Sequence, residues 1–441
     1  MESLTLHRLH FAFTITYHYL FPQLTMGLAF LIVVLKSLAL RTSDADYDHA
    51  VRFWSRILGV AFVMGVVTGI PMEFQFGTNW ARFARATGGI IGQALAMEGV
   101  FAFFLESSVL YFVLFGEKRL GPKGHWLATL LLWLGTWLSG YFVVCSNAFM
   151  QHPQGYRIDD EGVMRLESLS SLLLNRWALA QFSHTMIGSL ITASFVVSGT
   201  GAFFLLSNRH VGVTRKFMKV SVLAGLASAL LAAFPSGDAQ AKLVLEHQPI
   251  TFAAMEGHFH TERGAGLTLI GQPNLETLTL DNPITLPRVL SFLTHQRWDS
   301  EIRGLAAFPR ERWPDNVALL YYAYHVMAGL GSLFIAVTSL AACLIWRGKL
   351  HETRSVLWLL MLMFPLPFVA NTAGWMTAEL GRQPWLVYGI LRTSAGSSSQ
   401  VSAGTTLFSL LGFMGLYALL SLLFFFLITR IVAQGPSPGE G

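Results

Sequence analysis

Long apolar runs separated by short polar segments dominate the pattern of this chain. Nine runs reach the roughly 20 residues that a helix needs to cross a bilayer. They are about 11–40, 55–78, 93–116, 126–148, 182–206, 217–235, 318–346, 355–378 and 404–432. Runs of this length exclude the strands of a soluble core. The pattern predicts an all-α, polytopic membrane protein with nine transmembrane helices.

The basic residues between the runs predict how the helices are oriented. Alternate short loops carry Lys36, Arg41, Arg52 and Arg56; Lys118, Arg119 and Lys123; Arg209, Arg215, Lys216 and Lys219; and Arg347, Lys349 and Arg354. Short loops rich in lysine and arginine stay in the cytoplasm. This places the N-terminus outside and the C-terminus in the cytoplasm.

The same pattern divides the chain into three parts. Residues 1–235 hold helices one to six, and residues 318–441 hold helices seven to nine with a short tail, of which 435–441 is expected to fray. Between them, residues 236–317 form a long extracytoplasmic connection punctuated by proline. A connection this long without regular structure is usually functional or disordered.

Composition narrows the class of protein further. Hydrophobic residues make up 53% and charged residues 12% of the 441 residues, whereas a soluble domain carries roughly 25% charged residues. Nucleic-acid binding is excluded, because no dense basic cluster occurs outside the short loops. Cys145 and Cys343 are predicted near opposite membrane faces and cannot form a disulfide. The start of the chain shows no signal peptide.

Ionisable residues inside spanning helices are costly and mark function by default. Seven lie within the predicted helices, all in the half nearer the outer face: His18, Glu73, Glu98, Glu106, His184, His325 and Glu379. Their shared depth predicts one buried polar site near that face. Met327, by itself a common core filler, is a further candidate because His and Met form a known axial pair for haem.

Taken singly, these residues also fit structural roles. His18 can cap a carbonyl of a neighbouring helix. Glu98 and Glu106, about 12 Å apart along an α-helix, suit either a proton relay or hydrogen-bonded structural carboxyls. Glu379 can pair with Arg382 three residues on.

Several stretches together resemble subunit I of the cytochrome bd quinol oxidases, from about residue 4 to 432. In chain order they are Arg8–Thr14 leading to His18, Met72–Trp80, Ala96–Gly99, Phe103–Ser107, Phe182–Thr185, Gln248–Pro249, Ala253–Gly257 and Gly381–Trp385. Nine helices with an outer N-terminus are also the topology of that family. The connection looks like the family's short quinol loop.

The resemblance implies a terminal oxidase of the bacterial inner membrane, which oxidises a membrane quinol, reduces dioxygen to water and contributes to the proton motive force. It implies a low-spin haem b held by His184 and Met327. It also implies two high-spin haems at His18 and Glu379, one of them haem b and the other haem d or a third haem b. Arg382 beside Glu379 is grouped with the cofactor-binding residues.

The remaining roles follow from the same resemblance. Glu98 and Glu106 match carboxylates near the high-spin pair and the proton route, and Glu256 matches the acidic residue of the quinol loop. The expected partners are a second membrane subunit, subunit II, and small accessory single-span subunits.

Three positions depart from the family pattern. Thr251 stands where many members have Lys, so a threonine hydroxyl or a water would replace that hydrogen-bond donor. His325 stands where Arg is common two residues before the axial Met, which removes a fixed positive charge near the low-spin haem. His10 stands where Gln is common.

Two other functions fit the intramembrane residues. One is a haem-free, proton-coupled transporter, which needs neither the His184/Met327 pair nor a quinol loop. The other is a haem electron-transfer subunit that never reduces oxygen and binds no carbon monoxide. An inverted-repeat transporter has no support, because the chain shows no internal repeat.

Overall fold

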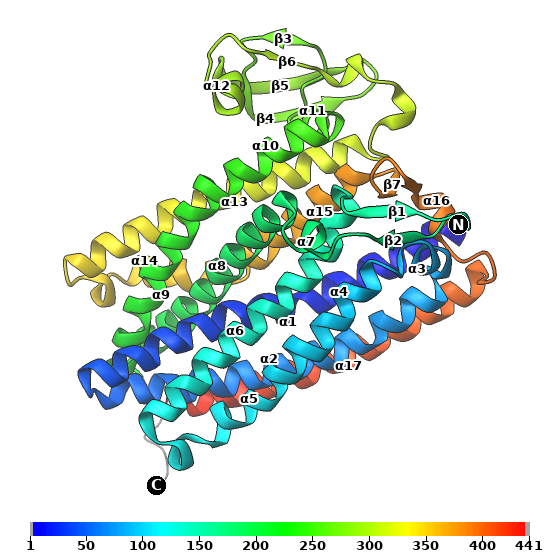
Figure 1. Ribbon diagram of the computed structural model, residues 1–441. Coiled ribbons are helices and arrows are strands. Elements are labelled where there is room, and N and C mark those ends of the chain that lie inside the picture. The colour runs from blue at the N-terminus through cyan, green and yellow to red at the C-terminus, as the bar shows by residue number, and fades with distance from the viewer. Residues whose placement is uncertain (1–2, 437–441) are drawn as a thin grey trace.

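A computed structural model describes residues 3–436, in which nine helical segments are long and apolar enough to cross a membrane. They run in a single tilted bundle (Figure 1). All nine coincide with the predicted runs, which confirms the fold class. Residues 437–441 of the tail predicted to fray lie outside the described part.

The first four spans begin at the N-terminus. They are α1 (Ser3–Thr42), α2 (Ala45–Thr78), the composite α4 (Ile91–Met97), η1 (Glu98–Phe103) and α5 (Phe104–Phe115), and α6 (Glu117–Gln151). The short helix α3 (Ala81–Thr87) follows α2. The segment η1 is a π-helix inserted between two α-helical halves.

A small hairpin of β1 (Tyr156–Ile158) and β2 (Met164–Leu166), followed by α7 (Leu169–Leu173), leads to the fifth span. That span is α8 (Arg176–Leu206). The sixth combines α9 (Val211–Leu231), the π-helix η2 (Ala232–Gly237) and α10 (Asp238–His247). Helical structure therefore continues to His247, past the expected boundary at 235.

The last spans are α13 (Val317–Trp346), α14 (Arg354–Met363) with α15 (Leu366–Arg382), and α17 (Ala403–Gln434). The short helix η5 (Leu350–Glu352) precedes α14. Strands β7 (Trp385–Val387) and β8 (Leu391–Arg392) and helix α16 (Thr393–Gly396) connect α15 to α17.

Residues 248–316 form an ordered cap over one end of the bundle, which we call the loop segment. It contains α11 (Pro249–Met255), β3 (Glu262–Arg263), β4 (Leu267–Asn274), β5 (Thr279–Leu286), α12 (Val289–His295), β6 (Glu301–Ile302), η3 (Leu305–Ala307) and η4 (Arg310–Arg312). Antiparallel pairs β3–β6 and β4–β5 give it regular structure. It has its own apolar core around Phe252, Met255 and Phe259.

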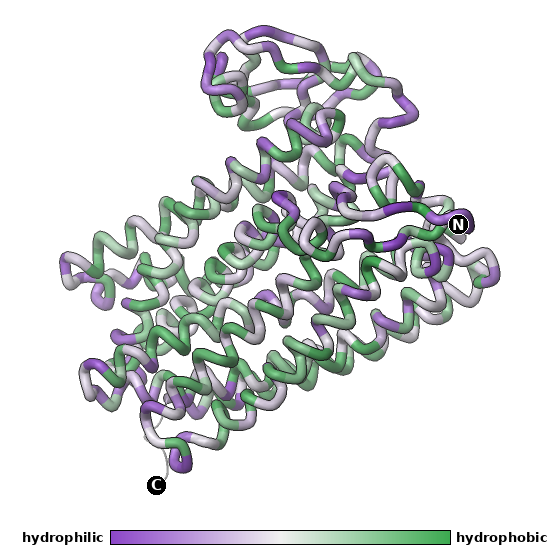
Figure 2. The backbone as a smooth tube through the Cα atoms, in the orientation of Figure 1, coloured by the Kyte–Doolittle hydropathy of each residue, from purple (hydrophilic) through white to green (hydrophobic). Residues whose placement is uncertain are grey.

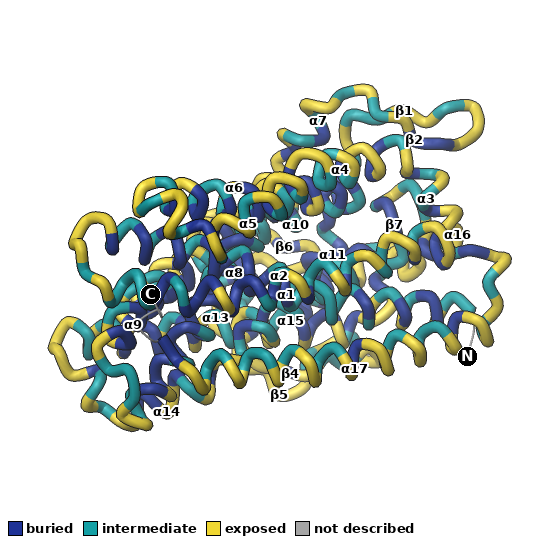
Figure 3. Tube along the Cα trace, turned by 90° about the horizontal axis from the view of Figure 1, so that it is seen from below, coloured by how far each residue is buried: buried dark blue, intermediate teal, exposed yellow. Residues whose placement is uncertain are grey.

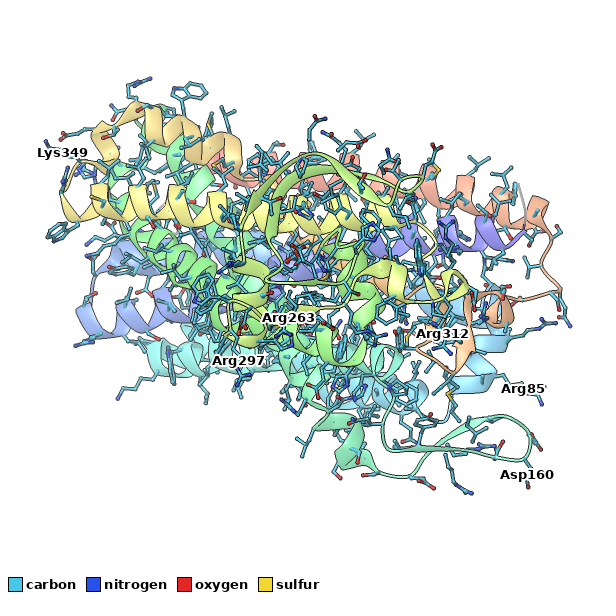
Figure 4. All side chains as sticks on the ribbon, turned by 90° about the horizontal axis from the view of Figure 1, so that it is seen from above. Arg85, Asp160, Arg263, Arg297, Arg312 and Lys349 are labelled. Atoms are coloured by element: carbon cyan, nitrogen blue, oxygen red, sulfur yellow. The ribbon has the colours of Figure 1, made fainter. Side chains whose placement is uncertain are left out.

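The loop segment and the start of α1 share one end of the bundle, which we call the loop end. Arg8 near the start of α1 bonds Asp315 of the loop segment at 2.8 Å. Helix α17 ends at the opposite end of the bundle (Figure 1). Arg263, Arg297 and Arg312 lie on the loop segment, whereas Lys349 lies at the far end (Figure 4).

Burial separates inner from outer helices. Helix α1 packs against α2, α6, α8 and α17, and helices α1 and α8 carry much of the buried surface. Helix α17 is mostly exposed or intermediate along its length (Figure 3). Apolar residues cover the helices while polar ones gather at the ends and in the cap (Figure 2). Exposed leucines and phenylalanines on α17 therefore suit lipid or a membrane partner.

One basic residue used to predict orientation is buried. Lys36 is 1% exposed. Its ammonium donates to Asp48 at 2.6 Å and to Glu117 at 3.2 Å. These two ion pairs link α1 to α2 and to α6 at the end of the bundle opposite the loop segment.

Candidate functional site

His184 lies eight residues into α8, and the π-helix η2 determines which ring nitrogen is free. The Ser236 hydroxyl donates its proton to the Leu231 carbonyl at 2.8 Å. Its oxygen lies 3.1 Å from His184 Nδ1, so Nδ1 must carry the hydrogen of that contact. Nε2 then keeps a lone pair, the form in which neutral histidine binds a metal.

His18 on α1 is held in the same way from α2. The Thr68 hydroxyl donates to the Met64 carbonyl at 2.8 Å. His18 Nδ1 lies 3.0 Å from the same hydroxyl oxygen and therefore donates to it. Gly69 packs beside the ring, where a Cβ would lie 3.0 Å from His18 Cε1. The Nε2 atom of His18 is likewise left as a lone-pair donor.

Met327 on α13 is brought to a depth similar to that of His184. The rings of Phe195 and Phe334 meet at 4.9 Å between centroids, which places α8 and α13 side by side. His184 lies 11 residues before Phe195 and Met327 seven before Phe334, so their depths differ by about 6 Å. On α15, a Cβ at Gly374 would lie 2.8 Å from Met327 Sδ, so glycine makes room for the thioether.

Glu379, in the last turn of α15, has partners on both carboxyl oxygens. Asn147 of α6 donates to Oε1 at 2.7 Å, and Arg382 bonds Oε2. Gln181 of α8 donates to Asn147 Oδ1 at 2.8 Å and so fixes the amide. Arg382 is buried, and its guanidinium pairs with the Glu379 carboxyl group. Lone pairs remain on the carboxylate for a metal ligand bond.

The donor set fits haem better than a protein metal cluster. Among residues 3–436, no three His, Cys, Asp or Glu side chains gather where they would hold a metal ion. The predicted ligands instead stand singly on α1, α8, α13 and α15. Haem iron needs only one or two axial side chains because the porphyrin supplies the other ligands.

Glu98 and Glu106 have different surroundings. Glu98 opens the π-helix η1 and accepts a hydrogen bond from the Ser139 hydroxyl at 2.7 Å. Glu106 is buried in α5. Because π-helical residues separate them, the 12 Å spacing expected for an α-helix does not apply. The carboxyls are still close enough to interact electrostatically.

The predicted common depth needs one correction. Six of the seven ionisable residues lie in the half of their helices nearer the loop end. Glu106 lies past the middle of its span, Ile91–Phe115. Glu106 is also past the midpoint of the predicted run 93–116, so its position in the sequence already placed it in the other half.

In the loop segment, Glu256 caps α11 and is only 4% exposed. Burial raises the pKa of Glu256 to about 7, and a hydrogen bond from the Tyr324 hydroxyl partly opposes this rise. A carboxyl with such a pKa can exchange a proton near neutral pH.

Thr251 of α11 does not offer the hydrogen bond expected of it. Its hydroxyl donates to the Gly381 carbonyl of α15 at 2.7 Å, and the side chain is buried. The Thr251 hydroxyl has one proton, and that proton is in the hydrogen bond to Gly381. Thr251 therefore does not replace the hydrogen-bond donor that Lys supplies in the family pattern. Thr251 instead anchors the loop segment to the end of the helix that carries Glu379.

The other two departures are also structural links. His325 Nδ1 lies 2.9 Å from the Tyr321 carbonyl and Nε2 lies 3.1 Å from the Thr268 carbonyl, which joins α13 to β4. His10 is buried against Gln75 at 3.0 Å and Asn79 at 3.1 Å, and so joins α1 to α2.

Three residues that contact the candidate ligands were not identified from the sequence, namely Thr68, Asn147 and Ser236. Hydroxyl and amide residues are common in spanning helices, so their type carries little signal. Pro235 before Ser236 was the single local sign of an interrupted helix. The structure confirms that Cys145 and Cys343 are both free.

Membrane-spanning architecture and single candidate ligands on separate helices define the class as a multi-pass membrane protein suited to haem. The family description that matches the chain is cytochrome bd terminal oxidase subunit I, over residues 6–436. The chain belongs to that family.

Individual proteins agree with this assignment. Cytochrome bd ubiquinol oxidase subunit 1 of Bacillus subtilis (strain 168) is 32% identical, covering 99% of this chain and 94% of the relative. Cytochrome bd-II ubiquinol oxidase subunit 1 of Escherichia coli (strain K12) is 30% identical, with 99% and 97% covered. The solved bd oxidase from Geobacillus thermodenitrificans superposes with a TM-score of 0.91 at 27% identity, covering 98% of this chain and 99% of that one.

Membership confirms the predicted activity. The protein is a haem-containing subunit of a terminal quinol oxidase that reduces dioxygen, and it is a multi-pass protein of the bacterial inner membrane. As subunit 1 of a bd oxidase, it has subunit II as its partner. The transporter and the electron-transfer subunit are both excluded as its function.

Proposed function

We propose that His184 and Met327 are the axial ligands of a low-spin haem b. His18 and Glu379 then serve two high-spin haems, a haem b and either a haem d or a third haem b. When bound, these groups carry electrons and supply the iron at which dioxygen is reduced. The observation that carries this assignment is the pair of hydroxyl contacts that leave Nε2 free on both histidines.

In this proposal the surrounding residues orient the ligands and supply protons. Ser236 and Thr68 hold the imidazoles, and Asn147 and Arg382 hold the Glu379 carboxylate. Glu98 and Glu106 lie on one composite helix and pass protons toward the site. The partner subunit and small accessory subunits cover exposed apolar helix faces such as that of α17.

The loop segment, residues 248–316, forms the quinol site, with Glu256 as the proton acceptor. A quinol hydroxyl must lose its proton as electrons leave, and a carboxyl with a pKa of about 7 is a suitable base at neutral pH. Leu280 of β5 packs over Gly257, the next residue.

Replacing Glu256 with Gln tests this role, because the substitution keeps the shape and removes the base. Quinol-driven oxygen consumption should fall by roughly 10²-fold. Oxygen consumption from an artificial donor that bypasses quinol should persist. Glu262→Gln, on an exposed strand of the same loop segment, is the matched control. A parallel loss of both activities in Glu256→Gln would contradict the proposal.

We also propose that the loop end faces outward. The basic clusters on the alternate loops support a cytoplasmic location for the opposite end. Quinol protons would then be released outside, while protons for water formation reach the haems from the cytoplasm through helices of this subunit or its partner.

A further inference from the structure

A small cavity lies at the end of the bundle opposite the loop end, between the end of α8, the start of α9, the end of α13 and η5. Its volume is about 210 Å³, and its basic lining residues are Arg215, Lys219 and His351. Lys349, labelled in Figure 4, directly precedes η5 and lies at this end of the molecule. The cavity is separate from the candidate haem ligands, which lie in the halves of their helices nearer to the loop end.

The basic residues of this cavity have no partner within residues 3–436. Arg215 and Lys219 are four residues apart on α9 and therefore share one face of that helix. Neither side chain forms a hydrogen bond or an ion pair with another described residue, and no described acidic residue lines the cavity. Lys216, the residue after Arg215, bonds Asp44 instead. Two unpaired cations beside a cavity favour an anionic ligand.

The cavity lies at the depth of lipid headgroups. Trp346, the last residue of α13, is 86% exposed, and Trp358 of α14 is 47% exposed. Exposed tryptophans on spanning helices are typical of the interface between the hydrocarbon core and the headgroups. Ile345, which precedes Trp346, lines the cavity. The basic groups of the cavity are therefore placed where phosphate oxygens of a bilayer are found.

The face of α9 that carries the two cations becomes apolar toward the middle of the membrane. Leu223 follows Lys219 by four residues and is 44% exposed, and Leu230 follows Leu223 by seven residues and is 48% exposed. Residues at these spacings lie on the same face of a helix. Charged groups at the end of a helix, followed by exposed leucines on the same face, match a phosphate headgroup followed by acyl chains.

The size of the cavity restricts the ligand further. Leu205, Met218 and Ile345 give it an apolar wall beside its charges. Pockets that enclose a whole organic ligand measure roughly 300–1,000 Å³, so a cavity of about 210 Å³ holds only part of such a molecule. A small anionic group whose apolar remainder stays outside satisfies both the volume and the wall.

We propose that this cavity binds the phosphate headgroup of an anionic phospholipid. Arg215 and Lys219 form charge-assisted hydrogen bonds with the phosphate oxygens, and the acyl chains lie along Leu223 and Leu230 of α9. Basic pockets between spanning helices are known to hold such headgroups. The proposal does not depend on the assigned haem ligands or on the quinol base.

The bound lipid has a structural task in this proposal. Leu205 belongs to α8, which carries His184, and Ile345 belongs to α13, which carries Met327. A headgroup in the cavity contacts both helix ends and α9 at once. It therefore stabilises the packing of the two helices that hold the proposed low-spin haem, far from the haem itself.

The experiment uses the purified complex of this subunit with subunit II, in detergent and freed of bound lipid. The probe is dihexanoyl-phosphatidylglycerol, and its Kd is obtained from the rise of the thermal unfolding midpoint with probe concentration. Dihexanoyl-phosphatidylcholine, with a zwitterionic headgroup, and inorganic phosphate are measured in the same way. The anionic lipid should stabilise the complex, whereas the other two compounds should have little effect.

The double substitution Arg215→Gln with Lys219→Gln removes both phosphate contacts. The Kd for dihexanoyl-phosphatidylglycerol should increase at least about tenfold, the effect of losing one charge-assisted hydrogen bond. Lys118→Gln with Lys123→Gln, two exposed residues near the start of α6 at the same end of the bundle, is the matched control with the same change of charge. It should leave the Kd unchanged. Haem difference spectra equal to those of the wild type establish that both variants are folded.

Four results would overturn the proposal. One is an unchanged Kd in the Arg215 and Lys219 variant, and another is an equal increase in the control variant, which would mean that only overall charge matters. Equal stabilisation by phosphatidylcholine or by inorganic phosphate would mean that the ligand is not an anionic lipid. The fourth is a wild-type complex that the anionic lipid does not stabilise, which would mean that subunit II covers this face.

Discussion

At the scale of single residues, hydrogen-bond direction is the strongest indication of ligand roles. Thr68 and Ser236 each give their proton to a backbone carbonyl, and each therefore accepts from a histidine Nδ1. The same contact, in which a hydroxyl from another helix accepts from His Nδ1, occurs at both His18 and His184. Histidines that only fill a core would not be expected to share it. It is expected where Nε2 must stay available for iron.

Met327→Leu tests the second axial ligand. Leucine keeps much of the side-chain volume and removes the sulfur, so the low-spin haem should become high-spin. Optical and EPR spectra of the oxidised protein measure this change. Met363→Leu, a buried core position in α14, provides the matched control and should leave the spectra unchanged. A low-spin signal that survives in Met327→Leu would refute the assignment.

At the scale of elements, two π-helices place candidate site residues. The segment η1 begins at Glu98, and η2 contains Ser236, whose hydroxyl contacts His184. Such insertions change which side of a helix a residue faces and are frequent at functional sites.

Ser236→Ala should weaken the orientation of His184. The ring loses the acceptor for Nδ1–H and becomes a poorer electron donor to the iron. The midpoint potential of the low-spin haem should rise by up to about 60 mV, a tenfold change for a one-electron couple. Spectroscopic redox titration measures it. Ser221→Ala is the control, because the Ser221 hydroxyl donates to the Met218 carbonyl of its own helix. Equal midpoint potentials in the two variants would contradict the proposal that Ser236 orients His184.

The elements also show what the sequence could predict. The nine spans could be predicted from the sequence because a bilayer requires long apolar helices. The strands and helices of the loop segment could not be predicted, because short strands such as β3 and β6 depend on contacts between residues far apart in the chain. The ligand candidates were recoverable because ionisable groups are rare in spans. Thr68, Asn147 and Ser236 were not, since only the folded structure shows which hydroxyl or amide meets a histidine or carboxyl.

At the scale of the whole molecule, the two ends of the bundle have different tasks. The loop end carries the loop segment and the small β1–β2 hairpin (Figure 1). The candidate ligands lie in the halves of their helices nearer to that end. The opposite end carries the basic loops and the buried Lys36 network. The proposed orientation follows from this asymmetry and can be tested without reference to haem or quinol.

Single cysteines at Asp160 and Lys349 test the orientation, because these exposed residues lie at opposite ends of the bundle (Figure 4). A membrane-impermeant maleimide should label Asp160→Cys in intact cells. It should label Lys349→Cys only after the inner membrane is opened, since basic loops stay in the cytoplasm. The unsubstituted protein is the control and measures the background labelling of Cys343, which is exposed on α13, whereas Cys145 is buried. Labelling of Lys349→Cys, but not Asp160→Cys, in intact cells would invert the topology and place quinol oxidation on the cytoplasmic side.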